Sequence, residues 1–170
     1  EEPEIPGIVA RFREYYQKDG WLDNAPYPGV REMLAGLKAR GYRIGVISNN
    51  ASLYNVFNVL EEYGIREYME DVEVSSITGY RKPHPEIFRI SMKQMQEKPE
   101  NCVYVGDTLS RDVIGSKEFG FEKAVYIQSF LSAQKDVGVV SSIQPDVTIR
   151  NMDELVPWLD SVNSKMDSES

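Results

Sequence analysis

Two aspartates in the segment Gly106–Asp112 have the residue types and positions best suited to chemistry. They follow the apolar run Cys102–Val105, which the sequence pattern predicts to be a buried strand. Carboxylate oxygens are preferred ligands of Mg²⁺, which usually takes its other ligands from water and substrate phosphate. The alternative is structural, with Asp107 in a turn and Asp112 capping a helix. The segment points to a site for Mg²⁺ and a phosphorylated ligand, unless both aspartates are structural.

A second polar pair, Ser48 and Asn49, follows the β-rich run Tyr42–Ile47. A serine hydroxyl and an asparagine amide can both donate hydrogen bonds to an anion. The alternative is that these two residues cap the next helix, which is a common use of both types. The pair is a candidate for phosphate binding.

The third candidate is Lys82, in a segment with prolines at positions 83 and 85 that stiffen the backbone. Its ammonium group could reach into a crevice, although a lysine in a loop is most often solvated. His84 is interpreted as structural. Because the chain has one histidine and one cysteine (Cys102), sites that need two of either residue are excluded.

Helical and strand patterns alternate along the chain, which favours a parallel sheet covered by helices on both faces. In such sheets ligands bind beyond the carboxyl ends of the strands. The three polar segments should therefore meet at one edge of the sheet. Helices are predicted over 5–17, 29–40, 53–60, 85–95, 113–117 and 155–162, and strands over 42–47, 72–77, 102–105, 124–127 and 147–149.

Composition narrows the classes of partner. The chain has 170 residues, with Lys+Arg 19 against Asp+Glu 27 and a net charge of -8, a length that fits one domain. Without a basic cluster, an acidic surface repels nucleic acid, and no apolar run of about 20 residues could span a membrane. The single thiol suits a reducing compartment, so we expect a cytoplasmic protein that acts on a small substrate. No heptad pattern indicates an oligomeric state.

Three motifs together resemble a known family. VISNN at 46–50, GYRKPHPEIF at 79–88 and VYVGDTLSRD at 103–112 resemble motifs two, three and four of the haloacid dehalogenase (HAD) superfamily. The stretch 26–50 is similar to its phosphoglycolate-phosphatase-like branch. The resemblance implies a Rossmann-like three-layer α/β/α parallel sheet, with a remnant of a helical cap at the N-terminus. It also implies Mg²⁺-dependent hydrolysis of a small phosphorylated metabolite through an aspartyl-phosphate.

The resemblance also implies roles for the candidate residues. Ser48 would hydrogen-bond the transferring phosphoryl group, with Asn49 as a weaker candidate. Lys82 would pair with the charge of the phosphate and the nucleophile. Asp107 would ligate Mg²⁺, and Asp112 would orient Lys82 or a metal-bound water without binding the metal directly.

One family motif is absent from the sequence. The first motif, D-x-D-x-T/V, carries the nucleophile on the central strand, and no D-x-D tripeptide occurs in these 170 residues. We therefore expect residues 1–24 to be the end of a helical cap, 25–162 to be a core lacking its first strand, and 163–170 to be a disordered tail. On this interpretation the chain is an N-terminally truncated, inactive phosphatase. Either the chain is incomplete or its sheet has closed over the gap.

Two other functions are compatible with the same motifs. The chain could be a HAD-like module without a nucleophile, which binds a phosphorylated ligand or a protein partner without turnover. It could also be a haloacid dehalogenase or a phosphomutase, since the family includes both reactions.

Overall fold

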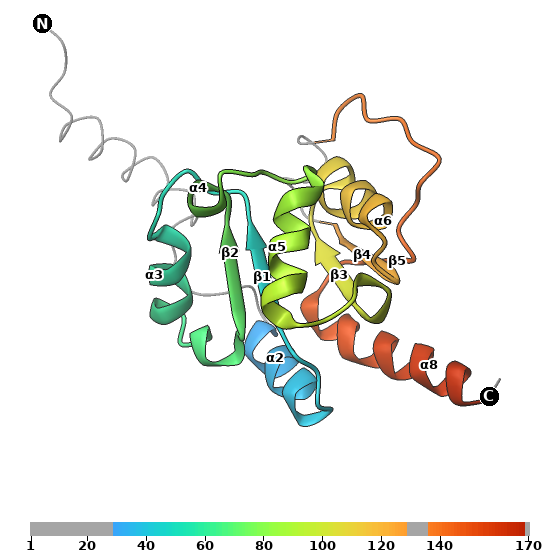
Figure 1. Ribbon diagram of the computed structural model, residues 1–170. Helices are drawn as coiled ribbons and strands as arrows, with labels where there is room; N and C mark the ends of the chain where they lie inside the picture. The colour runs from blue at the N-terminus through green and yellow to red at the C-terminus, as the bar shows by residue number, and fades with distance from the viewer. Residues whose placement is uncertain (1–28, 129–135, 169–170) are drawn as a thin grey trace, which may run out of the picture.

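Parallel strands alternate with helices in the computed structural model, which describes residues 29–128 and 136–168 (Figure 1). This arrangement confirms the predicted α/β class. The strands are β1 (Gly45–Ser48), β2 (Asp71–Val74), β3 (Val103–Gly106), β4 (Lys123–Ile127) and β5 (Val147–Ile149). The helices are α2 (Val30–Ala39), α3 (Asn55–Glu62), α4 (Ser75–Thr78), α5 (Pro85–Met95), α6 (Gly115–Phe119) and α8 (Leu155–Ser168), with a π-helical segment at Leu109–Ile114.

The strands form two separate parallel sheets. One contains β1 and β2, with Gly45 opposite Asp71, and the other has the order β3-β4-β5, with Val103 opposite Lys123. Within the described residues, β1 and β3 do not pair with each other. The sheet has therefore not closed over the gap that the sequence predicted.

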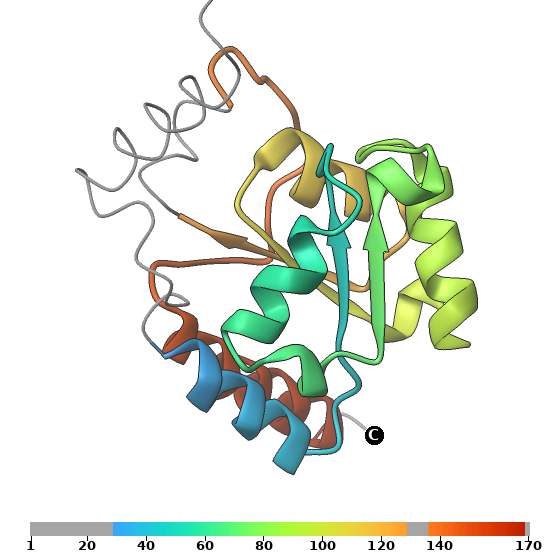
Figure 2. The ribbon, with the colours of Figure 1, turned by 90° about the vertical axis from the view of Figure 1, so that its left-hand side faces the viewer.

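Helices cover both faces of the strands, as the views in Figures 1 and 2 show. On one face, Leu37 of α2 and Leu159 of α8 pack against Val125 of β4. The adjoining part of that face holds α3, whose Leu60 packs with Leu34 of α2. On the other face, α5 packs against β3 and a cluster of phenylalanines. The layers are thus helix, strand, helix.

The predicted strand at 72–77 is wrong in its second half. Strand β2 ends at Val74, and the next residues form the short helix α4. The hydroxyl of Ser75 accepts a hydrogen bond from the Asn50 N–H and donates one to the Asn50 carbonyl, both at 3.1 Å. These bonds replace a further step of the strand ladder and turn the chain toward the segment that carries Lys82.

The predicted disorder of residues 163–170 is also wrong as far as Ser168, because α8 continues to that residue. Polar residues at the end of a helix can face solvent, and the Asn163 side chain donates a hydrogen bond of 2.8 Å to the Tyr42 hydroxyl. The predicted cap segment 1–24 and the predicted helix 5–17 lie outside the described residues. In the described part, no helix is long and apolar enough to cross a membrane.

Candidate active site

Three loops meet at the carboxyl edge of the strands, and a pair of hydrogen bonds joins two of them. The side-chain oxygen of Asn49 accepts from the Lys82 backbone N–H at 2.8 Å, and its amide N–H donates to the Lys82 carbonyl at 3.0 Å. Asn49 therefore clamps the backbone of the lysine loop to the end of β1. This use of the amide was not predicted, and it favours a structural task for Asn49 over phosphate binding.

Lys82 forms a buried ion pair with Asp112. Its Nζ atom lies 2.7 Å from Asp112 Oδ1, and the two side chains are only 12% and 5% exposed. The same Nζ lies 2.9 Å from the Tyr104 hydroxyl oxygen. Burial makes such a pair costly unless its polar atoms have partners, and these two contacts supply two of them for the ammonium. The structure thus brings Lys82 and Asp112 together, in keeping with the expectation that Asp112 could orient Lys82.

The second oxygen of Asp112 holds the loop that precedes it. Oδ2 accepts hydrogen bonds from the Thr108 backbone N–H at 3.0 Å and from its hydroxyl at 2.5 Å. A Cβ atom built on Gly106 would lie 2.3 Å from the Asp112 Cβ, so only glycine leaves room for this carboxylate. Asp112 is thus fixed on one side by its own loop and holds the lysine on the other.

Asp136 holds the same loop from outside, and sequence reasoning missed it. Its carboxylate accepts from the backbone N–H groups of Leu109 at 2.8 Å and Ser110 at 3.3 Å. These N–H groups belong to the first turn of the π-helical segment, where a helix leaves donors without partners of its own. Asp136 is more than 25 residues away from Leu109 and Ser110 in the sequence, so no local sequence pattern predicts this contact.

The other predicted site residues lie at the same edge. Ser48 is the last residue of β1, opposite Val74, and Asp107 follows β3 directly. Both are half-buried. His84 caps α5, with its Nδ1 accepting from the Glu86 N–H at 3.2 Å, so its structural interpretation is confirmed.

The donor set at this edge fits Mg²⁺ in part. Asp107 places a carboxylate directly after β3, and the two oxygens of Asp112 accept hydrogen bonds from Lys82 and Thr108. Among the described residues, no three His, Cys, Asp or Glu side chains lie close enough together to hold a metal ion. Mg²⁺ is often bound through one or two carboxylates, with phosphate oxygens and water completing its shell. Asp107 is therefore suited to be one direct ligand of such an ion.

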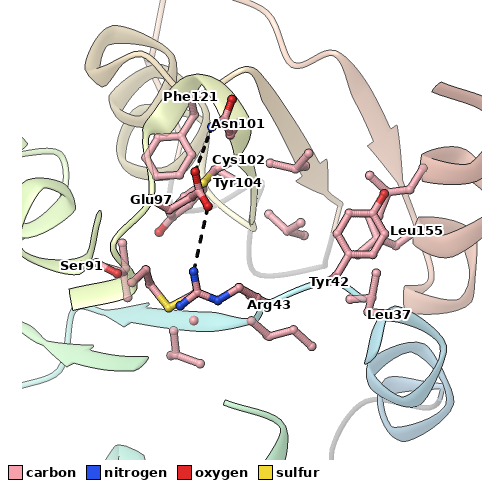
Figure 3. Close-up of a pocket in the computed structure, with 18 of the residues that line it drawn as sticks. Leu37, Tyr42, Arg43, Ser91, Glu97, Asn101, Cys102, Tyr104, Phe121 and Leu155 are labelled. Carbon is pink, nitrogen blue, oxygen red and sulfur yellow. Dashed lines mark hydrogen bonds and ion pairs between the residues drawn. The ribbon is translucent and has the colours of Figure 1, made fainter. Parts of the chain in front are cut away.

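A cleft of about 550 Å³ lies between β1 and β3 (Figure 3). Its walls include Val46 and Ile47 of β1 together with Val103 and Val105 of β3, and Lys82 also lines it. The central strands of a covered parallel sheet are normally buried. Here these four strand residues are only half-buried, because the cleft runs between their edges.

A polar group closes the amino end of this cleft. Figure 3 shows Arg43, which precedes β1, reaching toward Glu97 in the connection that leads to β3; their closest atoms, Nη1 and Oε2, are 4.0 Å apart. Glu97 also accepts a hydrogen bond of 2.9 Å from the Asn101 amide. These two interactions lower the pKa of the Glu97 carboxyl, the Asn101 bond more than Arg43. The cleft is thus polar at both ends and mainly apolar between them.

Comparison with known proteins shows to which family this fold and these motifs belong. The family model described as haloacid dehalogenase-like hydrolase matches residues 1–120, which is more than half of the chain. The chain belongs to this family. The resemblance of the three motifs is thereby confirmed at the level of the family.

Relatives within the family include phosphatases. The chain is 32% identical over 133 residues to a glyceraldehyde 3-phosphate phosphatase of Methanothermobacter thermautotrophicus, covering 78% of this chain and 58% of the relative. It is 33% identical over 130 residues to a phosphoglycolate phosphatase of Nitrosococcus oceani, covering 76% and 55%. A HAD phosphatase structure from Thermococcus onnurineus matches with a TM-score of 0.66 and 29% identity, covering 78% and 57%. The chain spans somewhat more than half the length of these family members.

Proposed function

We propose that this chain carries most of the active site of a Mg²⁺-dependent phosphatase that hydrolyses the monoester of a small phosphorylated metabolite. The observation that carries the proposal is the buried Lys82–Asp112 pair, held at 2.7 Å at the same strand edge as Ser48 and Asp107. The relatives named as phosphatases of small metabolites support the choice of substrate class.

Each residue has a task that its position or its contacts support. The Ser48 hydroxyl donates to a phosphoryl oxygen, and the Lys82 ammonium balances the negative charge of the phosphoryl group and of the attacking carboxylate. Asp112 keeps the ammonium in place through the contact at 2.7 Å. Asn49 acts through the Lys82 backbone that it clamps, not as a phosphate ligand.

Asp107 is the residue of this chain that would hold Mg²⁺, with phosphate oxygens, water and a further carboxylate as the other ligands. When bound, the ion shields the charge on the phosphoryl oxygens and so eases attack by an anionic nucleophile. Ser48 and Lys82 would position the phosphoryl group for that attack.

We propose that the attacking carboxylate arrives on a strand that lies in the cleft between β1 and β3. Within the described residues, the edges of both strands that face the cleft have no strand partner, and the walls are mainly apolar. A strand in this cleft would pair with both edges at the spacing of about 4.7–4.9 Å that neighbouring strands have in a sheet. A strand running parallel to β1 would end near Lys82, where a D-x-D segment would meet the ammonium.

The test is to supply that strand. The chain is produced with an upstream segment containing D-x-D-x-T, and phosphate release from glyceraldehyde 3-phosphate and phosphoglycolate is measured with and without Mg²⁺. We expect Mg²⁺-dependent hydrolysis that falls by at least about 100-fold in Asp107→Ala, which removes a direct ligand. Asp153→Ala, at an exposed position, is the matched control.

Two outcomes would overturn the proposal. Phosphate release that persists in EDTA, or in Asp107→Ala, would remove the metal assignment. If no hydrolysis appears, and inorganic phosphate raises the melting temperature of the chain as it stands, the protein is a phosphate-binding module without turnover.

A further inference from the structure

The hydroxyl of Tyr104 is a polar group in an otherwise aromatic part of the core. Tyr104 lies on β3 and is 9% exposed. Its ring meets Phe88 and Phe121 edge to face, with centroid distances of 5.6 and 5.2 Å. A buried phenol hydroxyl is costly unless it has a hydrogen-bond partner. Lys82 supplies that partner from the neighbouring loop.

The contact with Lys82 is a hydrogen bond and not a stacking of the ammonium on the ring. Nζ lies 2.9 Å from the hydroxyl oxygen but 5.5 Å from the ring centroid, which places it beyond the hydroxyl end of the ring. An ammonium group can only donate, so the phenol oxygen accepts.

Burial raises the pKa of Tyr104 well above its ordinary value, and the nearby Asp112 carboxylate adds to the effect. The phenol therefore keeps its proton throughout the neutral range. The neutral hydroxyl accepts from Lys82, whose ammonium also donates to Asp112.

We propose that Tyr104 is a positioning residue for Lys82. Together with Asp112 it takes two of the three N–H groups of the ammonium, which leaves the third for an anion in the cleft that Lys82 lines. A lysine stem is flexible, and one carboxylate alone would let the ammonium swing around it. Two partners on different parts of β3 and its following loop fix its direction. This inference rests on the proposed role of Lys82 in phosphoryl transfer.

The first test uses the chain as it stands and needs no activity. Hydrogen exchange of the Lys82 ammonium is measured by ¹H–¹⁵N spectroscopy tuned to lysine side chains, with the signal assigned from Lys82→Arg. In Tyr104→Phe, which keeps the ring contacts, we expect exchange to be about tenfold faster, since one charge-assisted hydrogen bond is lost. Tyr42→Phe is the matched control, because it removes a hydroxyl bonded to Asn163 instead. Unchanged exchange in Tyr104→Phe would overturn the inference.

The second test uses the hydrolytic form described above. We expect Tyr104→Phe to lower kcat about tenfold with a smaller change in KM, because the ammonium matters most as charge develops. A purely structural tyrosine would lower the melting temperature and leave both kcat and ammonium exchange unchanged, which would overturn the inference. If exchange quickens while even the wild type hydrolyses nothing, the positioning role is supported and the proposed function fails.

Discussion

The side-chain amide of Asn49 grips the backbone of Lys82 from both sides, donating to its carbonyl at 3.0 Å and accepting from its N–H at 2.8 Å. The two residues are 33 positions apart and belong to different βα loops. The Lys82 backbone is therefore held by Asn49, and the Lys82 side chain is held separately by Asp112.

Replacing Asn49 by alanine should destabilise the protein. Two half-buried backbone groups lose their partners, and we expect a loss of about 1–3 kcal/mol in the free energy of unfolding, measured with urea. Asn58→Ala, at an exposed position of α3, is the control and should change stability little. Equal effects of the two substitutions would contradict the clamp.

Removing the charge of Asp112 should have a larger effect. Asp112→Asn leaves the Lys82 ammonium buried without its counter-charge, so we expect a loss of about 3–5 kcal/mol in urea unfolding. Asp160→Asn breaks the pair with Arg40 at the surface, where solvent screening makes the effect much smaller. If both variants lose the same free energy of unfolding, the buried Lys82–Asp112 pair does not stabilise the fold more than a surface ion pair does.

Much of this arrangement was readable in the sequence, but not all of it. The order of helices and strands follows from apolar spacing and glycine stops, and it places Ser48, Lys82 and Asp107 at one edge. The tasks of Asn49, Tyr104 and Asp136 were not readable, because each depends on a contact between distant segments. Tyr104 in particular has the pattern of a core residue within a strand. Its hydroxyl, which must find a partner when buried, was the available signal.

The glycine before Asp107 can be tested directly. Gly106→Ala would place a Cβ atom 2.3 Å from the Asp112 Cβ, so the carboxylate must move away from Lys82. We expect a loss of about 2–3 kcal/mol in unfolding free energy, typical of overpacking, together with loss of hydrolysis in the active form. Gly36→Ala in α2 has 3.4 Å to the nearest atom and should be neutral or stabilising by about 0.5–1 kcal/mol. A stable, active Gly106→Ala would contradict the close approach.

Asp136 should protect the loop that carries the candidate metal ligand. In Asp136→Ala we expect the amide hydrogens of Leu109 and Ser110 to exchange about 10-fold faster or more, because each loses a bond to a charged acceptor. Amide hydrogen exchange by NMR measures this residue by residue. Val137→Ala changes the next residue, which is 82% exposed, and should leave both amides unaffected.

Ionisation of Glu73 should make the protein less stable as pH rises. It lies beside Asp71 on β2, and Asp71 in turn accepts a 2.6 Å hydrogen bond from the Ser91 hydroxyl of α5. Burial, and then the Asp71 charge, raise the pKa of Glu73 above its ordinary value of 4.5. Below pH 4.5 Glu73 is protonated in both the folded and the unfolded state, so the stability that comes with the buried neutral carboxyl is fully present.

As pH rises through the raised pKa of the folded state, Glu73 must ionise beside another carboxylate, and that stabilisation is lost. Glu73→Gln cannot ionise, so its melting temperature relative to the wild type should increase from pH 4.5 upward and then level off. Glu86→Gln should show the opposite trend, because Arg89 lowers the pKa of Glu86. Melting curves of all three proteins between pH 4 and 8 measure the difference directly. A constant gap between Glu73→Gln and the wild type would mean that Glu73 does not titrate with folding.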